Sequence, residues 1–189
     1  MKKLANKLTE KLVLYQIIED ENKELYSYGI WQGIVLLFNF ATALIISCSF
    51  HMLWQGIVFT AAYGFLRSYA GGYHSRTQTG CYFFSVLLIS VVLSFIKFFP
   101  WDKASIAAGV ILSSAVILIL APQEDENKQL DEKEQVVYKK LAYLVLFILI
   151  CLVLLSNYIG LFSLSVCIVM SICAAAFMVL LGKIRNSFR

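Results

Sequence analysis

Long apolar runs separated by short polar stretches dominate the sequence. Two runs without acidic or basic side chains, 25–66 and 141–182, are long enough to cross a hydrocarbon core of about 30 Å twice as helices, at about 1.5 Å per residue. Two shorter runs, 81–96 and 104–121, would each cross once. The stretch LVLFILICLVLL is apolar on every side instead of alternating, which favours helices over a β-barrel.

We therefore predict an all-α fold, a polytopic helical bundle in which residues 1–189 form a single membrane domain. About six transmembrane helices are expected, at 30–50, 52–66, 82–99, 104–121, 141–155 and 158–181. The second and fifth of these are short. The segment 52–66 is alternatively re-entrant, which would lower the count to five or four.

Composition supports a membrane protein. Apolar residues make up 60% of the chain, charged residues only 15%, and the mean hydropathy is +0.76. Within residues 1–27, Leu4, Leu8, Leu12 and Tyr15 recur at helical spacing with lysines on other faces. This predicts an amphipathic interfacial helix that contacts membrane lipid, with a docking surface for a peptide as the alternative. The net charge of +4 fits anionic lipid better than nucleic acid.

The distribution of lysine and arginine predicts the orientation, because loops rich in these residues stay in the cytoplasm. Basic residues are frequent before the first span, in the loops 67–81 and 122–140, and at the C-terminus. The other side carries Lys97 and Lys103. We therefore expect a multi-pass cell-membrane protein with both termini, the loop 67–81 and the charged loop 122–140 on the cytoplasmic side.

The loop RSYAGGYHSRTQTGC, residues 67–81, carries the candidate chemistry. A cysteine nucleophile needs a base nearby, and His74 and Cys81 could supply that pair. Cys81 directly follows the polar loop, where water, arginine charge and a helix N-terminus favour the thiolate. The unpaired N–H groups of that helix start are candidate donors to an oxyanion. The other cysteines, Cys48, Cys151, Cys167 and Cys173, fall inside apolar spans and are expected to be inert.

Further residues of this loop are candidates for substrate binding or for shaping the loop. The glycines permit close backbone approach or a positive φ, and the polar residues keep the loop hydrated. These candidates are Arg67, Gly71, Gly72, Ser75 and Arg76. An isolated histidine and cysteine can also be incidental. Two candidate ligands do not make a zinc site, so we expect no metal and no other cofactor.

The same loop resembles the core motif of the accessory gene regulator B (AgrB) family, the membrane peptidases of Gram-positive quorum sensing. The shared features are the arginine, the glycine pair, YH, and a cysteine seven positions after the histidine. A second stretch, LAPQEDENKQL at 120–130, resembles the opening of the family's second cytoplasmic loop, although Gln129 stands where members often have proline. The resemblance covers essentially the whole chain.

The resemblance implies a cysteine endopeptidase that removes the C-terminal part of an AgrD-like propeptide. On that interpretation His74 is the base and Cys81 forms a thioester, which then cyclises to a thiolactone or lactone signalling peptide. A Gram-positive source and a possible homo-oligomer would follow. A noncatalytic membrane scaffold and a small transporter remain alternatives, although the predicted spans contain no ionisable residue of the kind that transporters place at mid-membrane.

Overall fold

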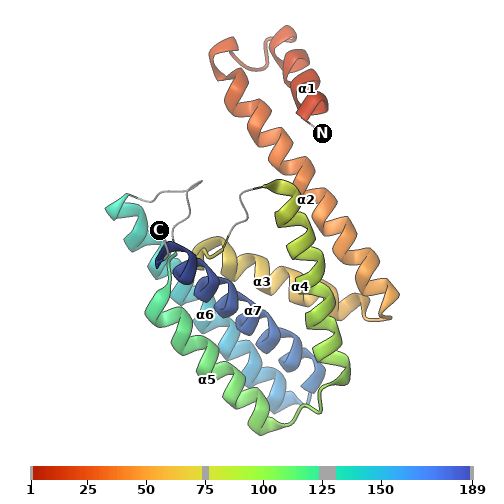
Figure 1. Cartoon of the computed structure of the whole chain (residues 1–189), viewed down its shortest axis with the longest axis vertical. Helices are drawn as coiled ribbons and strands as arrows, with labels where there is room; N and C mark the ends of the chain where they lie inside the picture. Colours follow the sequence, from red (N-terminus) through yellow and green to blue (C-terminus); the bar gives the residue numbers. More distant parts are fainter. Residues whose placement is uncertain (1, 74–76, 124–130, 188–189) are drawn as a thin grey trace. The chain divides into compact units, whose positions relative to one another are not determined.

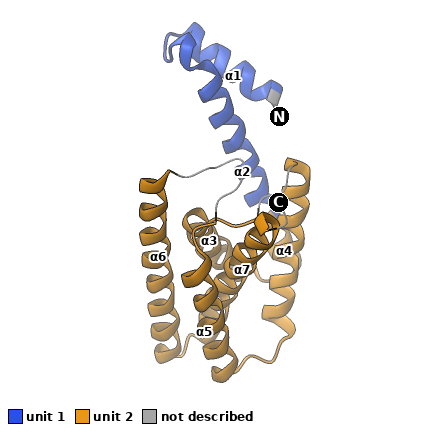
Figure 2. Cartoon of the chain, turned by 60° about the vertical axis from the view of Figure 1, so that its left-hand side comes forward, with its two compact units in different colours: residues 1–42 blue, residues 43–189 orange. Residues whose placement is uncertain are grey.

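A computed structural model describes residues 2–73, 77–123 and 131–187. These residues form seven α-helices and one short 3-10 helix, and no strand occurs among them. The all-α prediction is therefore confirmed. The chain divides into two compact units, residues 1–42 and residues 43–189 (Figure 2), and the boundary falls within the long helix α2.

The first unit contains α1 (Lys2–Leu14), the 3-10 helix η1 (Asp20–Asn22) and the first part of α2 (Lys23–Ser49). Helix α1 falls within the segment predicted to be amphipathic. Its apolar residues Leu4 and Leu8 are exposed, whereas Ala5 and Thr9 are buried. A hydrogen bond of 2.6 Å from the Ser27 hydroxyl to the Asn6 side-chain oxygen connects α2 to α1.

The second unit is a helical bundle (Figure 1). It contains the end of α2 and the helices α3 (Leu53–Ala70), α4 (Gln78–Phe98), α5 (Lys103–Leu120), α6 (Glu132–Ile159) and α7 (Phe162–Ser187). Short turns join most of these helices. Asp102 caps α5 by accepting a hydrogen bond from the Ser105 N–H at 2.8 Å, and the hydrogen bonds from Ser105 hold the pKa of Asp102 below its usual value.

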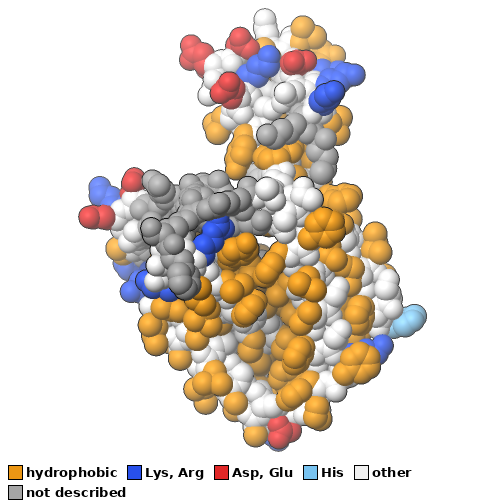
Figure 3. Space-filling view, in the orientation of Figure 1, with side chains coloured by type: hydrophobic (Ala, Val, Ile, Leu, Met, Phe, Trp, Pro, Cys, Tyr) orange, Lys and Arg blue, Asp and Glu red, His pale blue; other side chains and the backbone are white. Residues whose placement is uncertain are grey.

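Helix α7 is the centre of the bundle. It packs against α3, α4, α5 and α6, and its sequence is apolar around most of its circumference, as expected for a helix surrounded by others. Cys167, Val169, Ile172 and Val179 are fully buried. The buried hydroxyl of Ser171 donates to the carbonyl of Phe59 in α3 at 3.2 Å. Hydrophobic side chains also cover the outer faces of the bundle helices (Figure 3), as a hydrocarbon solvent requires.

Among the described residues, five helices are long and apolar enough to span a membrane: η1 with α2, then α4, α5, α6 and α7. The prediction of about six transmembrane helices is roughly consistent with this number, and the difference concerns the segment 52–66. That segment is part of α3, which contains Gln55, Tyr63 and Arg67 and is not among the five. Helix α3 instead buries Gly56, Phe59, Ala62, Leu66 and Ala70 along one side, and it packs on α6 and α7.

The helices extend further than the hydropathy predicted. Helix α3 continues to Ala70 and α4 begins at Gln78, so the connection is 71–77 instead of the predicted 67–81. Helix α6 begins at Glu132 and includes much of the predicted loop 122–140. Polar residues such as Arg67, Lys139 and Lys140 are poor predictors of helix ends, because a helix leaving an apolar environment continues into a polar one without losing its backbone hydrogen bonds.

One end of the bundle gathers the segments singled out by their motifs. We call it the loop end, formed among the described residues by 70–73, 77–78, 121–123, 131–132 and 178–187. Backbone contacts join Gly71 to Gln123 and Tyr73 to Met178. The opposite end is formed by 50–52, 98–103 and 159–162, where Lys97 donates to the Phe50 carbonyl at 3.3 Å. His51 lies in the turn at that end, as expected.

Candidate functional site

Cys81 lies in the first turn of α4 and is half-buried. The helix begins at Gln78, and the Thr77 side-chain oxygen caps it by accepting a hydrogen bond from the Gly80 N–H at 3.1 Å. Helical side chains lean toward the N-terminus of their helix. The Cys81 thiol is therefore directed toward the start of α4, where the helix dipole favours a negative charge.

Two backbone donors of this first turn are already paired. The Cys81 N–H donates to the Thr77 carbonyl at 3.0 Å, and the Gly80 N–H is used by the Thr77 side chain. Neither group is available to an oxyanion while the cap is intact. A donor to an oxyanion would come from the earlier N–H groups of the helix start or from a side chain at the loop end.

Arg67, in the last turn of α3, is the polar group that could supply such a donor. Its Nη2 donates to the carbonyl oxygen of Tyr73, and its guanidinium carbon lies 5.9 Å from the centre of the Tyr63 ring. The second nitrogen, Nη1, is buried with no partner among the described residues. A ligand oxygen at Nη1 would satisfy a buried charged donor, which is costly to leave unpaired.

The glycine pair adopts conformations that other residues rarely adopt. Gly71 has φ +70° and Gly72 has φ +124°, which confirms that positive φ angles occur at these two positions. A Cβ at Gly71 would lie 2.1 Å from the carbonyl oxygen of Gln123, and a Cβ at Gly72 would lie 2.7 Å from that of Met178. The glycines are therefore required by close backbone approach as well as by φ.

The structure also joins the two motifs that are far apart in the sequence. The Gln123 N–H donates to the Ala70 carbonyl at 3.0 Å, and Gly71 forms an isolated parallel bridge with Gln123. The side chain of Gln123 donates to the Leu120 carbonyl. The stretch that begins at Leu120 thus supports the backbone leading into the loop. Sequence spacing gave no signal for this pairing.

Three predicted residues, His74, Ser75 and Arg76, lie outside the described residues. The described chain resumes at Thr77, the cap of α4. The pairing of His74 with Cys81 therefore stays a prediction. The described neighbours of His74 on the N-terminal side, Gly72 and Tyr73, are held against α7 through the Met178 carbonyl.

The other four cysteines lie in helices, as predicted, and all five thiols are free. Cys167 is buried in α7 and Cys173 is half-buried in the same helix. Cys48 in α2 and Cys151 in α6 are exposed on the helix surface. Among the five, Cys81 is the one located in a first helical turn beside the polar loop.

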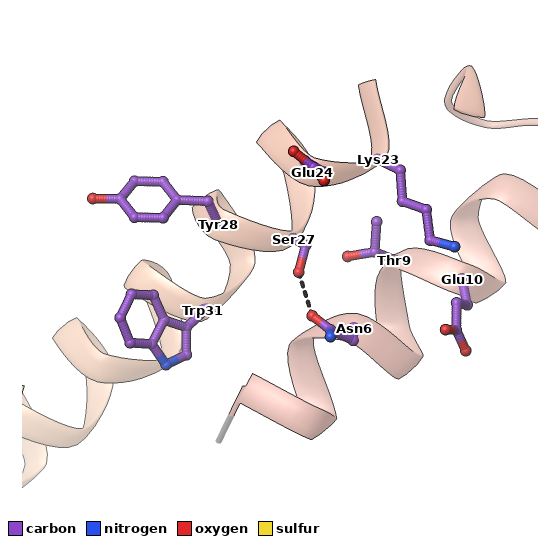
Figure 4. Close-up of a pocket in the computed structure, with 8 residues that line it drawn as sticks. All are labelled: Asn6, Thr9, Glu10, Lys23, Glu24, Ser27, Tyr28 and Trp31. Atoms are coloured by element: carbon purple, nitrogen blue, oxygen red, sulfur yellow. Dashed lines mark hydrogen bonds between the residues drawn. The ribbon is translucent and has the colours of Figure 1, made fainter. Parts of the chain in front are cut away.

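A concave region lies in the first unit, between α1 and the start of α2 (Figure 4). Its volume is about 600 Å³. The lining is mostly polar, with the aromatic rings of Tyr28 and Trp31 along one side, and includes Asn6, Thr9, Glu10, Lys23, Glu24 and Ser27. Tyrosine and tryptophan beside charged side chains are typical of membrane interfaces. This lining agrees with an interfacial role for 1–27; peptide docking there stays a prediction.

Comparison with known proteins decides the family. The sequence profile described as AgrB, accessory gene regulator B, matches residues 1–180. The chain belongs to the AgrB family. The AgrB profile includes the loop with Cys81, the stretch after Leu120 and α7 as far as residue 180.

Curated relatives agree with this assignment. An AgrB-like protein of Clostridium perfringens strain SM101 is 25% identical over 162 residues, which is 81% of this chain and 75% of the relative. An AgrB-like protein of Halalkalibacterium halodurans is 22% identical over 163 residues, 85% of this chain and 81% of the relative. No solved structure matches. AgrB membership supports a multi-pass membrane protein of Gram-positive quorum sensing with an AgrD-like propeptide as partner.

Proposed function

We propose that this AgrB protein is a cysteine endopeptidase that cleaves an AgrD-like propeptide and promotes cyclisation of the product. The observation that carries the proposal is the position of the half-buried Cys81 in the first turn of α4, beside the polar loop. AgrB membership and the joined motifs at the loop end support it. The experiment that tests it is substitution of Cys81, argued in the Discussion.

The proposed reaction has two acyl transfers. His74 takes the proton of the Cys81 thiol, and the sulfur attacks the carbonyl carbon of the scissile peptide bond. The C–N bond breaks, His74 returns the proton to the leaving amine, and the N-terminal part of the propeptide remains as a thioester on Cys81. A cysteine thiol or serine hydroxyl of that peptide then attacks the thioester, which closes the ring and releases the Cys81 sulfur to be reprotonated.

Cyclisation competes with hydrolysis, and the surroundings of Cys81 favour cyclisation. The Cys81 thiol is half-buried, which limits access of water to the acyl group. An internal nucleophile held close to the thioester has a high effective concentration. The ring-forming step needs no metal or other cofactor.

Arg67 is proposed to bind the substrate through Nη1, which lacks a partner among the described residues. An acyl oxygen or an acidic side chain of the propeptide would provide the acceptor. Nη2 at the same time shapes the loop by binding the Tyr73 carbonyl. Arg76 and Lys139 or Lys140 are further candidates for holding an acidic segment, although setting the topology is an equally simple role for the two lysines.

Removing the charge of Arg67 tests this role. In the Arg67→Gln variant we expect kcat/KM for propeptide cleavage to fall by about tenfold to a hundredfold, the cost of losing a hydrogen bond to a charged group. Salt should raise the apparent KM of the wild type only as far as exposed cations such as Lys139 and Lys140 hold the propeptide, because exposed charges are screened within about 8 Å at physiological ionic strength whereas a buried pair is screened much less. An unchanged kcat/KM in Arg67→Gln would favour a purely topological role.

The proposal places the loop end on the cytoplasmic side, where a newly synthesised propeptide is found. The described basic residues concentrate at that end of the bundle, and include Arg67, Lys133, Lys139, Lys140, Lys183 and Arg185. The opposite end carries Lys97 and Lys103. This asymmetry supports the orientation predicted by the positive-inside rule.

Labelling with a membrane-impermeant maleimide tests the orientation. A variant that retains Cys81 as its single cysteine should be labelled in inverted vesicles and protected in intact cells. Alkylation should also stop cleavage. A matched variant with Cys48 as its single cysteine reports background reaction from a helix surface. Strong labelling of Cys81 in intact cells would contradict a cytoplasmic site.

A noncatalytic scaffold remains the main rival. It predicts that Cys81→Ser retains signalling, since serine differs from cysteine only in the replacement of sulfur by oxygen and fits the same space. A transporter is less consistent with the described spans, because charged residues in them lie near the ends, such as Lys97 in α4.

A further inference from the structure

We infer that the C-terminal part of α7 positions the candidate base by clamping the residue before it. The clamp consists of Met178, Gly182 and Arg185, spaced four and three residues apart. Residues at this spacing share one face of a helix. All three contact the segment Gly72–Tyr73, and Tyr73 is joined by its peptide bond to His74. The contacts of the clamp do not depend on the proposed function, whereas their effect on catalysis rests on it.

The first contact of the clamp is between backbones. The Tyr73 N–H donates to the Met178 carbonyl at 2.8 Å, although that carbonyl belongs to the interior of a helix. Such an approach requires small residues on both sides. A Cβ at Gly182 would lie 3.1 Å from the Cα and carbonyl carbon of Gly72 and from the Tyr73 nitrogen. Glycine at 182 therefore allows the loop to lie directly on α7.

The second contact holds the Tyr73 side chain. The Arg185 guanidinium carbon lies 5.2 Å from the centre of the Tyr73 ring, which is within range of a cation–π interaction. The Phe84 ring lies 5.7 Å from the Tyr73 ring at an interplanar angle of 46°. Phe84 follows Cys81 by three residues, so it lies on the same face of α4 as the thiol.

The third contact fixes the peptide group that leads into His74. Its oxygen is the Tyr73 carbonyl, which accepts the hydrogen bond from Arg67. Tyr73 is thus held at its N–H by α7, at its ring by α7 and α4, and at its carbonyl by α3. Proton transfer depends on heavy-atom distances of about 2.6–3.2 Å, so a base attached to a loosened segment would lose much of its efficiency. Gly182 and Arg185 act as positioning residues.

Two substitutions test the clamp. We expect Arg185→Ala to lower kcat by about threefold to thirtyfold, the range of one partly exposed cation–π interaction. Gly182→Ala should lower kcat by about threefold to tenfold, because a Cβ 3.1 Å from the Gly72 backbone pushes the loop back by a few tenths of an ångström, whereas a displacement near 1 Å at a catalytic group costs about a hundredfold. In both variants KM should change less than kcat, since neither residue is proposed to touch the propeptide. Arg185→Lys should recover most of the activity.

Matched controls separate the clamp from general damage to the helix. Lys183→Ala removes a neighbouring charge that lies on another face of α7. Gly64→Ala adds a methyl group to a helical glycine with open space around it. Both controls should retain wild-type kcat. A loss in Lys183→Ala as large as that in Arg185→Ala would overturn a specific role for Arg185.

Hydrogen exchange of the Tyr73 amide supplies a readout that does not depend on catalysis. This amide should be protected in the wild type and in Cys81→Ala, and exchange at least tenfold faster in Arg185→Ala and Gly182→Ala. Unchanged protection in these two variants overturns the clamp. Faster exchange with unchanged kcat overturns the positioning role. Cleavage that persists in Cys81→Ala overturns the proposed function instead, while the exchange rates still decide whether the clamp exists.

Discussion

Replacing Cys81 by alanine is expected to abolish propeptide cleavage, with a fall in kcat of about 10⁴-fold or more, as for nucleophiles in other covalent peptidases. The reason is that no thioester can form without the sulfur. The measurement is cleavage of a synthetic propeptide by the variant in vesicles, followed by mass spectrometry. Membrane insertion should be unaffected, because Cys81 is half-buried in the first turn of α4 and makes no core contact there.

Controls for this substitution come from the same chain. Cys48→Ala and Cys151→Ala remove exposed thiols from helix surfaces and should leave cleavage nearly unchanged. His74→Ala should be as inactive as Cys81→Ala, and the double variant should be no worse than either, because the two residues act as one unit. Near wild-type cleavage by Cys81→Ala would exclude the cysteine peptidase mechanism.

The second large effect is expected from Gly71→Ala, which should lower kcat/KM by about a hundredfold. The added Cβ would lie 2.1 Å from the Gln123 carbonyl oxygen, and alanine is strained at φ +70°. Separation of Gly71 from Gln123 would move the start of the loop away from the stretch that follows Leu120. The measurement is steady-state kinetics together with quantification of the inserted protein.

Gly64→Ala is the matched control for this variant, because a Cβ at Gly64 meets nothing within 4 Å. It should have wild-type kinetics and wild-type expression. If Gly71→Ala is also fully active and fully inserted, the bridge between the two motifs has no role in catalysis. If Gly71→Ala inserts poorly, its rate is compared per inserted molecule. Hydrogen exchange of the Gln123 amide in the inserted fraction then decides whether the bridge is lost.

Hydropathy predicted most of the fold because the solvent for these helices is apolar. Every apolar run became a helix, from α2 to α7. The helix ends were predicted less well, since Arg67 and Lys139 continue helices beyond the apolar runs. The short segment 52–66 was ambiguous for a physical reason. Helix α3 buries one side against its neighbours and keeps apolar side chains such as Ile57 and Phe65 exposed, while Gln55 and Arg67 interrupt its apolar run, so the pattern fits both a packed helix and a short membrane segment.

The candidate site was predicted only in part. The sequence correctly indicated that Cys81 begins a helix next to a loop with positive-φ glycines. It did not reveal the pairing of Gly71 with Gln123 or the contact of Tyr73 with Met178, because both join segments distant in sequence through backbone atoms. One signal was present for the second contact. An isolated glycine in a helical pattern, here Gly182, often marks close packing.

The most direct measurement of the central claim is the intact mass of the protein during turnover. The substrate is a propeptide in which the ring-forming cysteine or serine is replaced by alanine, so that the acyl group cannot cyclise. After an acid quench, the wild-type protein should gain the mass of the N-terminal peptide fragment, and neutral hydroxylamine should remove it. Fragmentation should locate the adduct on Cys81. Cleavage of this substrate without any adduct, or an adduct on another residue, would contradict the account.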